Sequence, residues 1–147
     1  MKGRSAEQFD PNAYITRAEF AAICARFDKS DVSGTNKFND INTSWAKDLI
    51  TRAAGLGWIN GYADGTFRPQ NHITRAEAMS MVNKMLGRLP ETKEDLLEGM
   101  KTWSDNSDSA WYYLHVQEAT NSTKFNRKAD GVHITWTELI PNKVWDK

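Results

Sequence analysis

Three glutamates recur in the chain at one position of a short repeated sequence. Residues 15–19 read Ile-Thr-Arg-Ala-Glu, residues 73–77 repeat this sequence, and residues 134–138 read Ile-Thr-Trp-Thr-Glu. A pair of carboxylates is the machinery of a glycosidase. Each glutamate, however, follows a threonine by three residues, which is the spacing of a capping box at a helix start. The predicted caps pair Thr16 with Glu19, Thr74 with Glu77, and Thr135 with Glu138. One structural role explains all three glutamates, so the sequence favours helix capping over catalysis.

The other side chains that often carry chemistry form no catalytic or metal-binding motif. Cys24 is the lone cysteine, which excludes an internal disulfide, and we expect it to be a buried small hydrophobe. The three histidines, His72, His115 and His133, share no spacing with a nucleophile. Residues 30–37 and 60–71 lack oxygen ligands at the positions that a calcium loop requires. We therefore predict no enzyme, no metal site and no cofactor.

The caps predict three helices at a regular spacing. Thr74 follows Thr16 by 58 positions (74 − 16) and Thr135 follows Thr74 by 61 (135 − 74), which indicates a repeat protein. Apolar residues recur at helical spacing after the first two caps. We expect these two helices to end near Asp28 and Gly87, and the third to be short because Pro141 would clash within it. The predicted shared core consists of Phe20, Ile23, Phe27, Met81, Val82 and Met85.

Further elements are predicted between the capped helices. The pattern of residues 45–56 indicates a helix that ends at the glycines that follow, and residues 111–121 indicate another. Residues 64–65 read Asp-Gly, which predicts a tight turn, and Phe67 should point inward from the loop after it. Residues 92–95 predict a short capped helix or turn.

Composition limits the class of protein. The chain has 147 residues, enough for one ordinary domain with a real core. Its 19 basic and 19 acidic side chains give no net charge to favour nucleic acid or an anionic membrane. We expect no membrane insertion, because no apolar run approaches spanning length, and the first residues lead into no signal-peptide core.

One stretch carries a resemblance to a known family. It reads Phe38-Asn-Asp, then Trp45-Ala46, then Gly57-Trp-Ile-Asn-Gly61-Tyr62-Ala-Asp64-Gly65-Thr66-Phe67-Arg-Pro69, and ends on Ile73-Thr-Arg75-Ala-Glu77. This pattern resembles an S-layer homology motif nearly from end to end. Residues 1–29 are similar to the second half of such a motif, residues 38–87 to a complete one, and residues 102–147 to a divergent third motif with a tail. Residues 88–101 would be a linker.

The resemblance implies both a fold and a function. The fold would be mainly α, a pseudo-threefold bundle of helix-loop-helix motifs with long connecting loops, in one compact domain. The function would be non-catalytic: such modules hold exported proteins at the bacterial cell surface by binding secondary cell-wall polysaccharide, often pyruvylated, in grooves between motifs. The positions that the resemblance nominates for glycan binding are Arg17, Arg75, Trp45, Trp111, Asp40, Asp105, Gly61 and Tyr62.

The chemistry of these side chains supports the nomination in part. An arginine just inside a helix start offers a charged fork of donors that suits a carboxylate on a sugar. An indole offers a flat apolar face for a sugar ring. Trp136 stands at the arginine position of the third motif, so we expect a third groove to lack this charge and Trp136→Arg to do little harm.

Each nominated residue also has a structural alternative. Trp45 and Trp111 are equally well explained as core residues. The arginines could form a solvated face or a structural pair. Asp40 and Asp105 could cap the turns beside them.

Two further expectations concern partners. A protein interaction scaffold of the same fold without glycan binding is the alternative function. Because the chain opens in the second half of a motif, the outer helix before the Thr16 helix would be absent. We therefore expect self-association through that face, or a tail containing Val144 and Trp145 that folds back over it.

Overall fold

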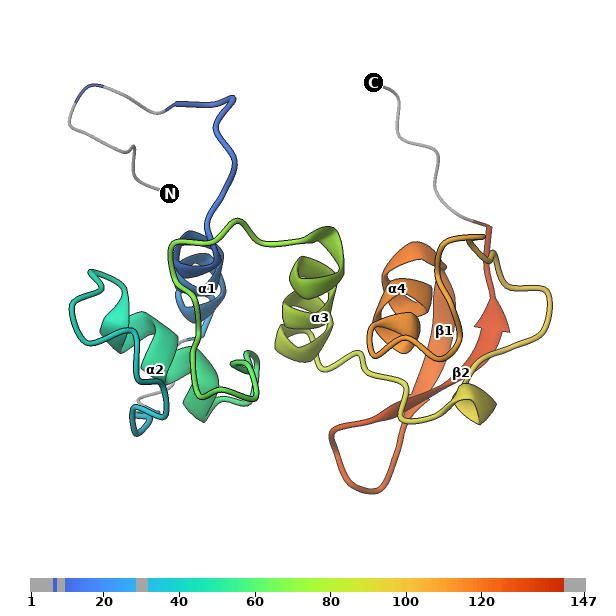
Figure 1. The fold of residues 1–147 in the computed structure, drawn as a ribbon. Helices are drawn as coiled ribbons and strands as arrows, with labels where there is room; N and C mark the ends of the chain where they lie inside the picture. The colour runs from blue at the N-terminus through green and yellow to red at the C-terminus, as the bar shows by residue number, and fades with distance from the viewer. Residues whose placement is uncertain (1–6, 8–9, 29–31, 142–147) are drawn as a thin grey trace. The chain divides into compact units, whose positions relative to one another are not determined.

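The structure is a computed structural model, and it describes residue 7, residues 10–28 and residues 32–141. The described part contains four α-helices, one short 3-10 helix and a two-stranded antiparallel sheet (Figure 1). The class is therefore mainly α, as predicted. The chain divides into two compact units, Met1–Thr74 (unit 1) and Arg75–Lys147 (unit 2). The threefold arrangement and the motif boundaries stay predictions.

Unit 1 is built on two packed helices, α1 (Arg17–Ala25) and α2 (Lys47–Gly55). Helix α1 starts at the predicted capping box: Glu19 N donates to Thr16 Oγ1 at 3.2 Å, and Thr16 N donates to Glu19 Oε2 at 2.7 Å. Helix α2 ends in a Schellman motif, because Gly57 has a φ of 73° and the amides of Gly57 and Trp58 donate back into the helix.

The core of unit 1 differs from the predicted one at the end of α1. Phe27 is 68% exposed, so its assignment to the core is wrong. The helix already ends at Ala25, and its buried face consists of small side chains that allow close packing. These are Ala18, Ala21, Ala22, Cys24 and Ala25. Cys24 is thus buried as predicted, and burial raises the pKa of its thiol.

Unit 2 also contains a packed helix pair, α3 (Arg75–Met85) and α4 (Tyr113–Thr120). Both lie where the sequence predicts helices, and Met81 of α3 is buried, as predicted for a core residue. A short 3-10 helix, η1 (Lys93–Asp95), starts at a capping box formed by Thr92 and Asp95. Helix α3 begins directly after Thr74, whose capping role stays a prediction.

The third predicted helix is wrong, because residues 134–139 form a strand. Strand β1 (Thr123–Arg127) pairs antiparallel with β2 (Ile134–Leu139). Thr135 and Glu138 are therefore strand residues and cap no helix. Ile134 and Trp136 are both buried, and this alternation is the period of a strand and not of a helix.

The two residues that mimic a capping box have other partners in the strand. The Thr135 hydroxyl donates to Asp95 Oδ1 at 2.6 Å, and Glu138 pairs with Lys124 at 2.7 Å across the two strands. A turn at Asp130 and Gly131 connects β1 to β2, with a φ of 71° at Gly131.

Candidate functional site

The start of α1 is closed by a loop from the following motif. The backbone amides of Arg17 and Ala18 donate to the carbonyls of Asn71 and Pro69, at 2.8 and 3.0 Å. These two amides are among the four that a helix start leaves without a partner inside the helix. Because backbone carbonyls already cover them, they are not available to an anion.

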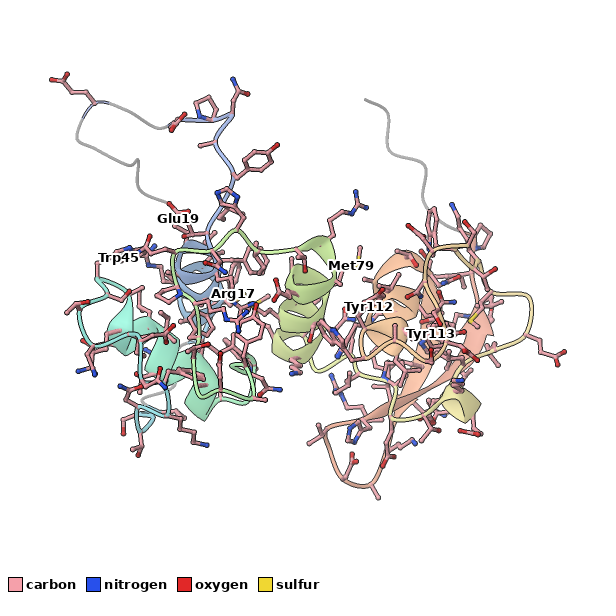
Figure 2. All side chains as sticks on the ribbon, viewed as in Figure 1. Arg17, Glu19, Trp45, Met79, Tyr112 and Tyr113 are labelled. Atoms are coloured by element: carbon pink, nitrogen blue, oxygen red, sulfur yellow. The ribbon has the colours of Figure 1, made fainter. Side chains whose placement is uncertain are left out.

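The Arg17 side chain holds the same loop. The Arg17 side chain, labelled in Figure 2, is only 3% exposed. Its Nε donates to the carbonyl of Phe67 at 2.8 Å. Its Nη2 reaches the carbonyl of Asn60 at 3.4 Å, and the guanidinium lies 4.7 to 4.8 Å from the ring centres of Phe67 and Tyr62. The sequence nominated Arg17 for ligand contact, and here its contacts position the loop that carries Tyr62.

Two other nominated residues support this loop. The two carboxylate oxygens of Asp40 accept from the amides of Phe67 and Arg68, at 2.8 and 2.7 Å. Gly61 has no room for a side chain, since a Cβ there would lie 2.5 Å from both the Phe38 ring and the Thr66 carbonyl. The contacts of Asp40 are structural, but they are made with a loop 27 to 28 residues further along the chain and not with the turn beside Asp40. Gly61 serves close packing.

Arg68 is a surface residue of this loop that the sequence reasoning missed. Its guanidinium lies 3.9 Å from the centre of the Tyr62 ring. Its Nε donates to Thr66 Oγ1 at 3.2 Å and its Nη2 to Asp64 Oδ2 at 3.0 Å. Hydrogen bonds from Thr66 and then from Arg68 lower the pKa of Asp64 to about 2, so this carboxylate stays charged at neutral pH.

The backbone of Arg68 is in the left-handed region, with a φ of 57°. That conformation costs a non-glycine residue roughly 1 kcal/mol. Asp10 occupies the corresponding place one repeat earlier, because it directly precedes Pro11 as Arg68 directly precedes Pro69, and it has a φ of 59°. The sequence feature shared by the two left-handed residues is the triplet Phe-Xaa-Pro, in which each is the middle residue. In the second repeat this triplet follows the Asp64-Gly65 turn.

The two nominated tryptophans are on the surface. Trp45, just before α2, is 62% exposed, and Trp111, just before α4, is 64% exposed. The alternative that they are core residues is therefore wrong for both. An exposed indole is available for contact with a ligand.

Arg75 and Asp105 are also exposed. Arg75 is the first residue of α3, where the helix dipole adds positive potential. Among the described residues, no ion pair involves its guanidinium. Arg17 and Arg75 therefore occupy equivalent sequence positions but have different surroundings, one buried under a loop and one facing solvent.

Trp136 stands at the arginine position of the third motif, and it belongs to the core of unit 2. It is 2% exposed, and its Nε1 donates to Glu118 Oε2 at 2.6 Å. Burial raises the pKa of Glu118, whose other oxygen lies 2.6 Å from Arg88 Nε in an ion pair. Trp136→Arg would bring a second cation into this buried site, so we now expect it to destabilise unit 2 instead of doing little harm.

One group of side chains in the described part has the spacing of metal ligands. Glu91, Asp130 and His133 place one possible ligand atom each within 4.8 Å of one another. The ammonium of Lys128 already pairs with Glu91 at 2.9 Å, and His133 Nδ1 lies 2.6 Å from Asp130 Oδ2. These contacts form an ion-pair cluster at the hairpin and give no separate indication of a cation.

The chain matches known proteins over most of its length. The family model of the S-layer homology domain matches residues 1–21 and 37–79. Cell surface glycoprotein 1 of Acetivibrio thermocellus is 35% identical over 131 residues, which cover 80% of this chain and 5% of that protein. The cellulosome-anchoring protein of the same organism is 34% identical over 118 residues, 75% of this chain and 25% of that protein.

A third relative comes from another genus. The surface layer protein of Brevibacillus choshinensis is 31% identical over 127 residues, 82% of this chain and 11% of that protein. The chain thus spans a quarter or less of the length of each of these three relatives.

None of the described helices is long and apolar enough to cross a membrane. The family match falls on the capped helix at Thr16, the Trp45 helix and the loop that Arg17 holds, and the chain belongs to the S-layer homology domain family.

Proposed function

We propose that this chain is a non-catalytic module that holds a larger protein at the bacterial cell surface by binding an anionic cell-wall polysaccharide. The support is its family and the names of its relatives, which are a cell surface glycoprotein, a cellulosome-anchoring protein and a surface layer protein. The observation that carries the binding part is the exposure of Trp45 and Trp111. They stand at equivalent motif positions, and both are more than 60% exposed.

The two indoles supply the surface that a neutral part of a sugar needs. Large aromatic side chains are usually well buried, so two exposed indoles at matching places of a repeat are unusual. A sugar ring that stacks on an indole removes apolar area of both partners from water. We therefore assign ring stacking to Trp45 and Trp111.

The charged part of the ligand is assigned to Arg75. Its exposed guanidinium at the start of α3 combines a fixed charge with the positive end of the helix. A carboxylate on the polymer, such as a pyruvate ketal, has the matching charge and the matching fork of acceptors. Asp105 is exposed beside the Trp111 segment and stays a weaker candidate for hydrogen bonds to sugar hydroxyls.

Retention on purified cell walls tests the proposal. We expect the wild-type chain to sediment with the walls, and Trp45→Ala together with Trp111→Ala to reduce this by tenfold or more, about 1 kcal/mol for each indole. Leu86→Ala is the matched control, since Leu86 is 54% exposed and is not among the positions nominated for glycan binding. The melting temperature of all variants should stay close to that of the wild type, because these side chains are on the surface.

The same experiment decides between the glycan and the protein scaffold. Walls stripped of their secondary polymer should no longer retain the chain, and walls that carry the polymer without its ketal should retain it weakly. Retention that survives removal of the polymer would contradict the proposal and favour a protein partner.

A further inference from the structure

We propose that Arg68, stacked on Tyr62, is an anion-binding subsite of unit 1 that takes a carboxylate of the wall polymer. This inference rests on the proposed function and names a contact residue that neither the motif arginines nor the exposed tryptophans supply. The observations that carry it are the fixed position of the guanidinium, its open edge and the strained backbone beneath it.

The guanidinium of Arg68 is held in place from two sides. One face lies 3.9 Å from the centre of the Tyr62 ring. The edge formed by Nε and Nη2 is occupied by Thr66 Oγ1 at 3.2 Å and Asp64 Oδ2 at 3.0 Å. An arginine side chain normally loses much rotamer freedom when it binds a ligand. Here these contacts have already restricted it, which lowers the entropic cost of binding.

The remaining edge is the one that suits a carboxylate. It consists of Nη1 and the second hydrogen of Nη2, and no acceptor from the described residues lies against Nη1. Arg68 retains 43% of its side-chain exposure in this position. A carboxylate can accept two parallel hydrogen bonds from such an edge. The half-buried Tyr62 ring, whose centre lies 3.9 Å from the guanidinium, is the nearby apolar surface for the sugar that carries the carboxylate.

The backbone conformation at position 68 indicates that the arginine there does not serve to stabilise the fold. Arg68 adopts a φ of 57°, which glycine or asparagine would adopt at lower cost. The Asp40 carboxylate accepts from the backbone amides of Phe67 and Arg68, and these hydrogen bonds do not involve the side chain at position 68. Arg17, whose guanidinium lies 4.8 Å from the centre of the Tyr62 ring, is 3% exposed and already holds the loop. The loop is therefore secured without the Arg68 side chain.

Arg68→Gly separates binding from folding, because it removes the guanidinium and relieves the backbone. We expect its melting temperature to equal or exceed that of the wild type, while the affinity for intact cell walls falls about tenfold or more, as for a lost hydrogen bond to a charged group. Arg68→Lys keeps the charge and loses the fork, so it should recover part of the affinity. Asp10→Gly is the control for glycine at the equivalent backbone position and should bind as the wild type does.

Chemical treatment of the walls identifies the group that Arg68 binds. Amidation of wall carboxylates with a carbodiimide should abolish the difference between wild type and Arg68→Gly. Removal of phosphate with hydrofluoric acid should preserve that difference in the polymer that remains. A difference that disappears only when phosphate is removed, or an Arg68→Gly variant that binds intact walls like the wild type, would overturn the inference.

Failure of the proposed function gives a different result. In that case the wild type is not retained on intact walls at all. The inference is then tested separately by titration with sodium D-glucuronate, monitored by NMR of the Arg68 Nε–H signal. A saturable shift of that signal supports the subsite, and an unmoved signal rejects it.

Discussion

Arginines at one position of the repeated motif have two different roles. Arg17 donates to buried backbone carbonyls under the loop, whereas Arg75 faces solvent at the start of α3. The surroundings of each arginine depend on which loop packs against it in the fold. The position of the arginine in the motif does not determine which loop this is. The two residues should therefore respond differently to the same substitution.

Arg75→Ala should weaken wall binding by about 1.5 to 3 kcal/mol and leave the melting temperature unchanged, because a hydrogen bond to a charged ligand is lost. Arg17→Ala should lower the free energy of unfolding of unit 1 by a similar amount, since the carbonyls of Phe67 and Asn60 lose their donor. Wall retention and thermal unfolding of both variants provide the measurement. Equal wall binding by Arg75→Ala and the wild type would contradict the assignment of Arg75.

Trp136 occupies the position that Arg17 and Arg75 hold in the other two motifs, and here the informative variant introduces an arginine. Trp136→Arg should destabilise unit 2 by about 3 kcal/mol or more, because a core side chain is lost and a cation is buried. The hydrogen bond from Trp136 to the Glu118 carboxylate is lost as well. Denaturant unfolding compares this variant with Trp111→Arg, which is on the surface and should change stability little. A Trp136→Arg variant as stable as the wild type would show that the indole does not pack as described.

His115 should make the stability of unit 2 depend on pH. It packs against Ser80 and Trp111, and burial followed by the charge of Lys84 lowers its pKa to about 4 from 6.5. Between these values the unfolded state binds more protons than the folded state, so stability is full above about pH 6.5 and falls as the pH approaches 4. The expected loss is about 3 kcal/mol at pH 4 relative to pH 7.

Urea unfolding at several pH values measures this effect. Other groups contribute to the pH dependence as well, since burial raises the pKa of Glu118, so the informative quantity is the difference between the wild type and His115→Gln. The variant should lose less stability than the wild type between pH 7 and pH 4. Parallel pH profiles would contradict a buried neutral His115.

At the scale of elements, the loop of residues 60–67 and the end of α2 each depend on one glycine, Gly61 and Gly57, in different ways. Gly61→Ala would place a Cβ 2.5 Å from the Phe38 ring and from the Thr66 carbonyl, so the loop must move and carry Tyr62 with it. We expect a cost of up to about 3 kcal/mol together with weaker wall binding. Gly57→Ala meets nothing within 4 Å and should cost only the left-handed backbone, about 1 kcal/mol, with unchanged binding. Unfolding and wall retention of the pair separate the two effects.

The helices were predictable because their signals are local. The capping box at Thr16 and Glu19 and the Schellman end at Gly57 involve residues within one turn, and both are present. The third capping box failed because the spacing of Thr135 and Glu138 is equally compatible with a strand. Alternation of Ile134 with Trp136 was the better guide, since a short pattern of period two outweighs a cap without a helical stripe behind it.

The candidate site was only partly predictable from the sequence. Exposure of Trp45 and Trp111 could not be read from residue type, because large aromatic residues serve both as core and as binding surface. The role of Arg17 depends on the carbonyls of Asn60 and Phe67, which lie far away along the chain. Contacts of that kind follow from the fold and leave no local signal.

At the scale of the whole molecule, self-association stays a prediction that the described surface supports. Phe27 is 68% exposed at the end of α1 and Tyr14 is 77% exposed before its start. Exposed apolar residues beside one helix can recruit a second copy. Trp145, the proposed intramolecular cover, lies outside the described residues.

Sedimentation at several concentrations tests this prediction. We expect the average mass to rise with concentration, and Phe27→Ser to shift the chain towards the monomer. The control Val132→Ser removes an exposed apolar side chain of unit 2 and should change nothing. A constant monomer mass for the wild type over the full range would reject self-association.

The closure of α1 by the carbonyls of Pro69 and Asn71 has a consequence for how such chains can be cut and rejoined. A graft that transfers one sequence motif by itself would deliver a helix without the loop that seals it, and would leave the donor with a loop that seals nothing. The segment that can be transferred intact has different boundaries from the motif. It runs from the start of one capped helix to the start of the next, from Thr16 to Thr74. Chimeric repeat proteins joined at these helix starts should keep the amides of each helix start covered by the loop that follows. Chimeras joined at the ends of the motifs should not.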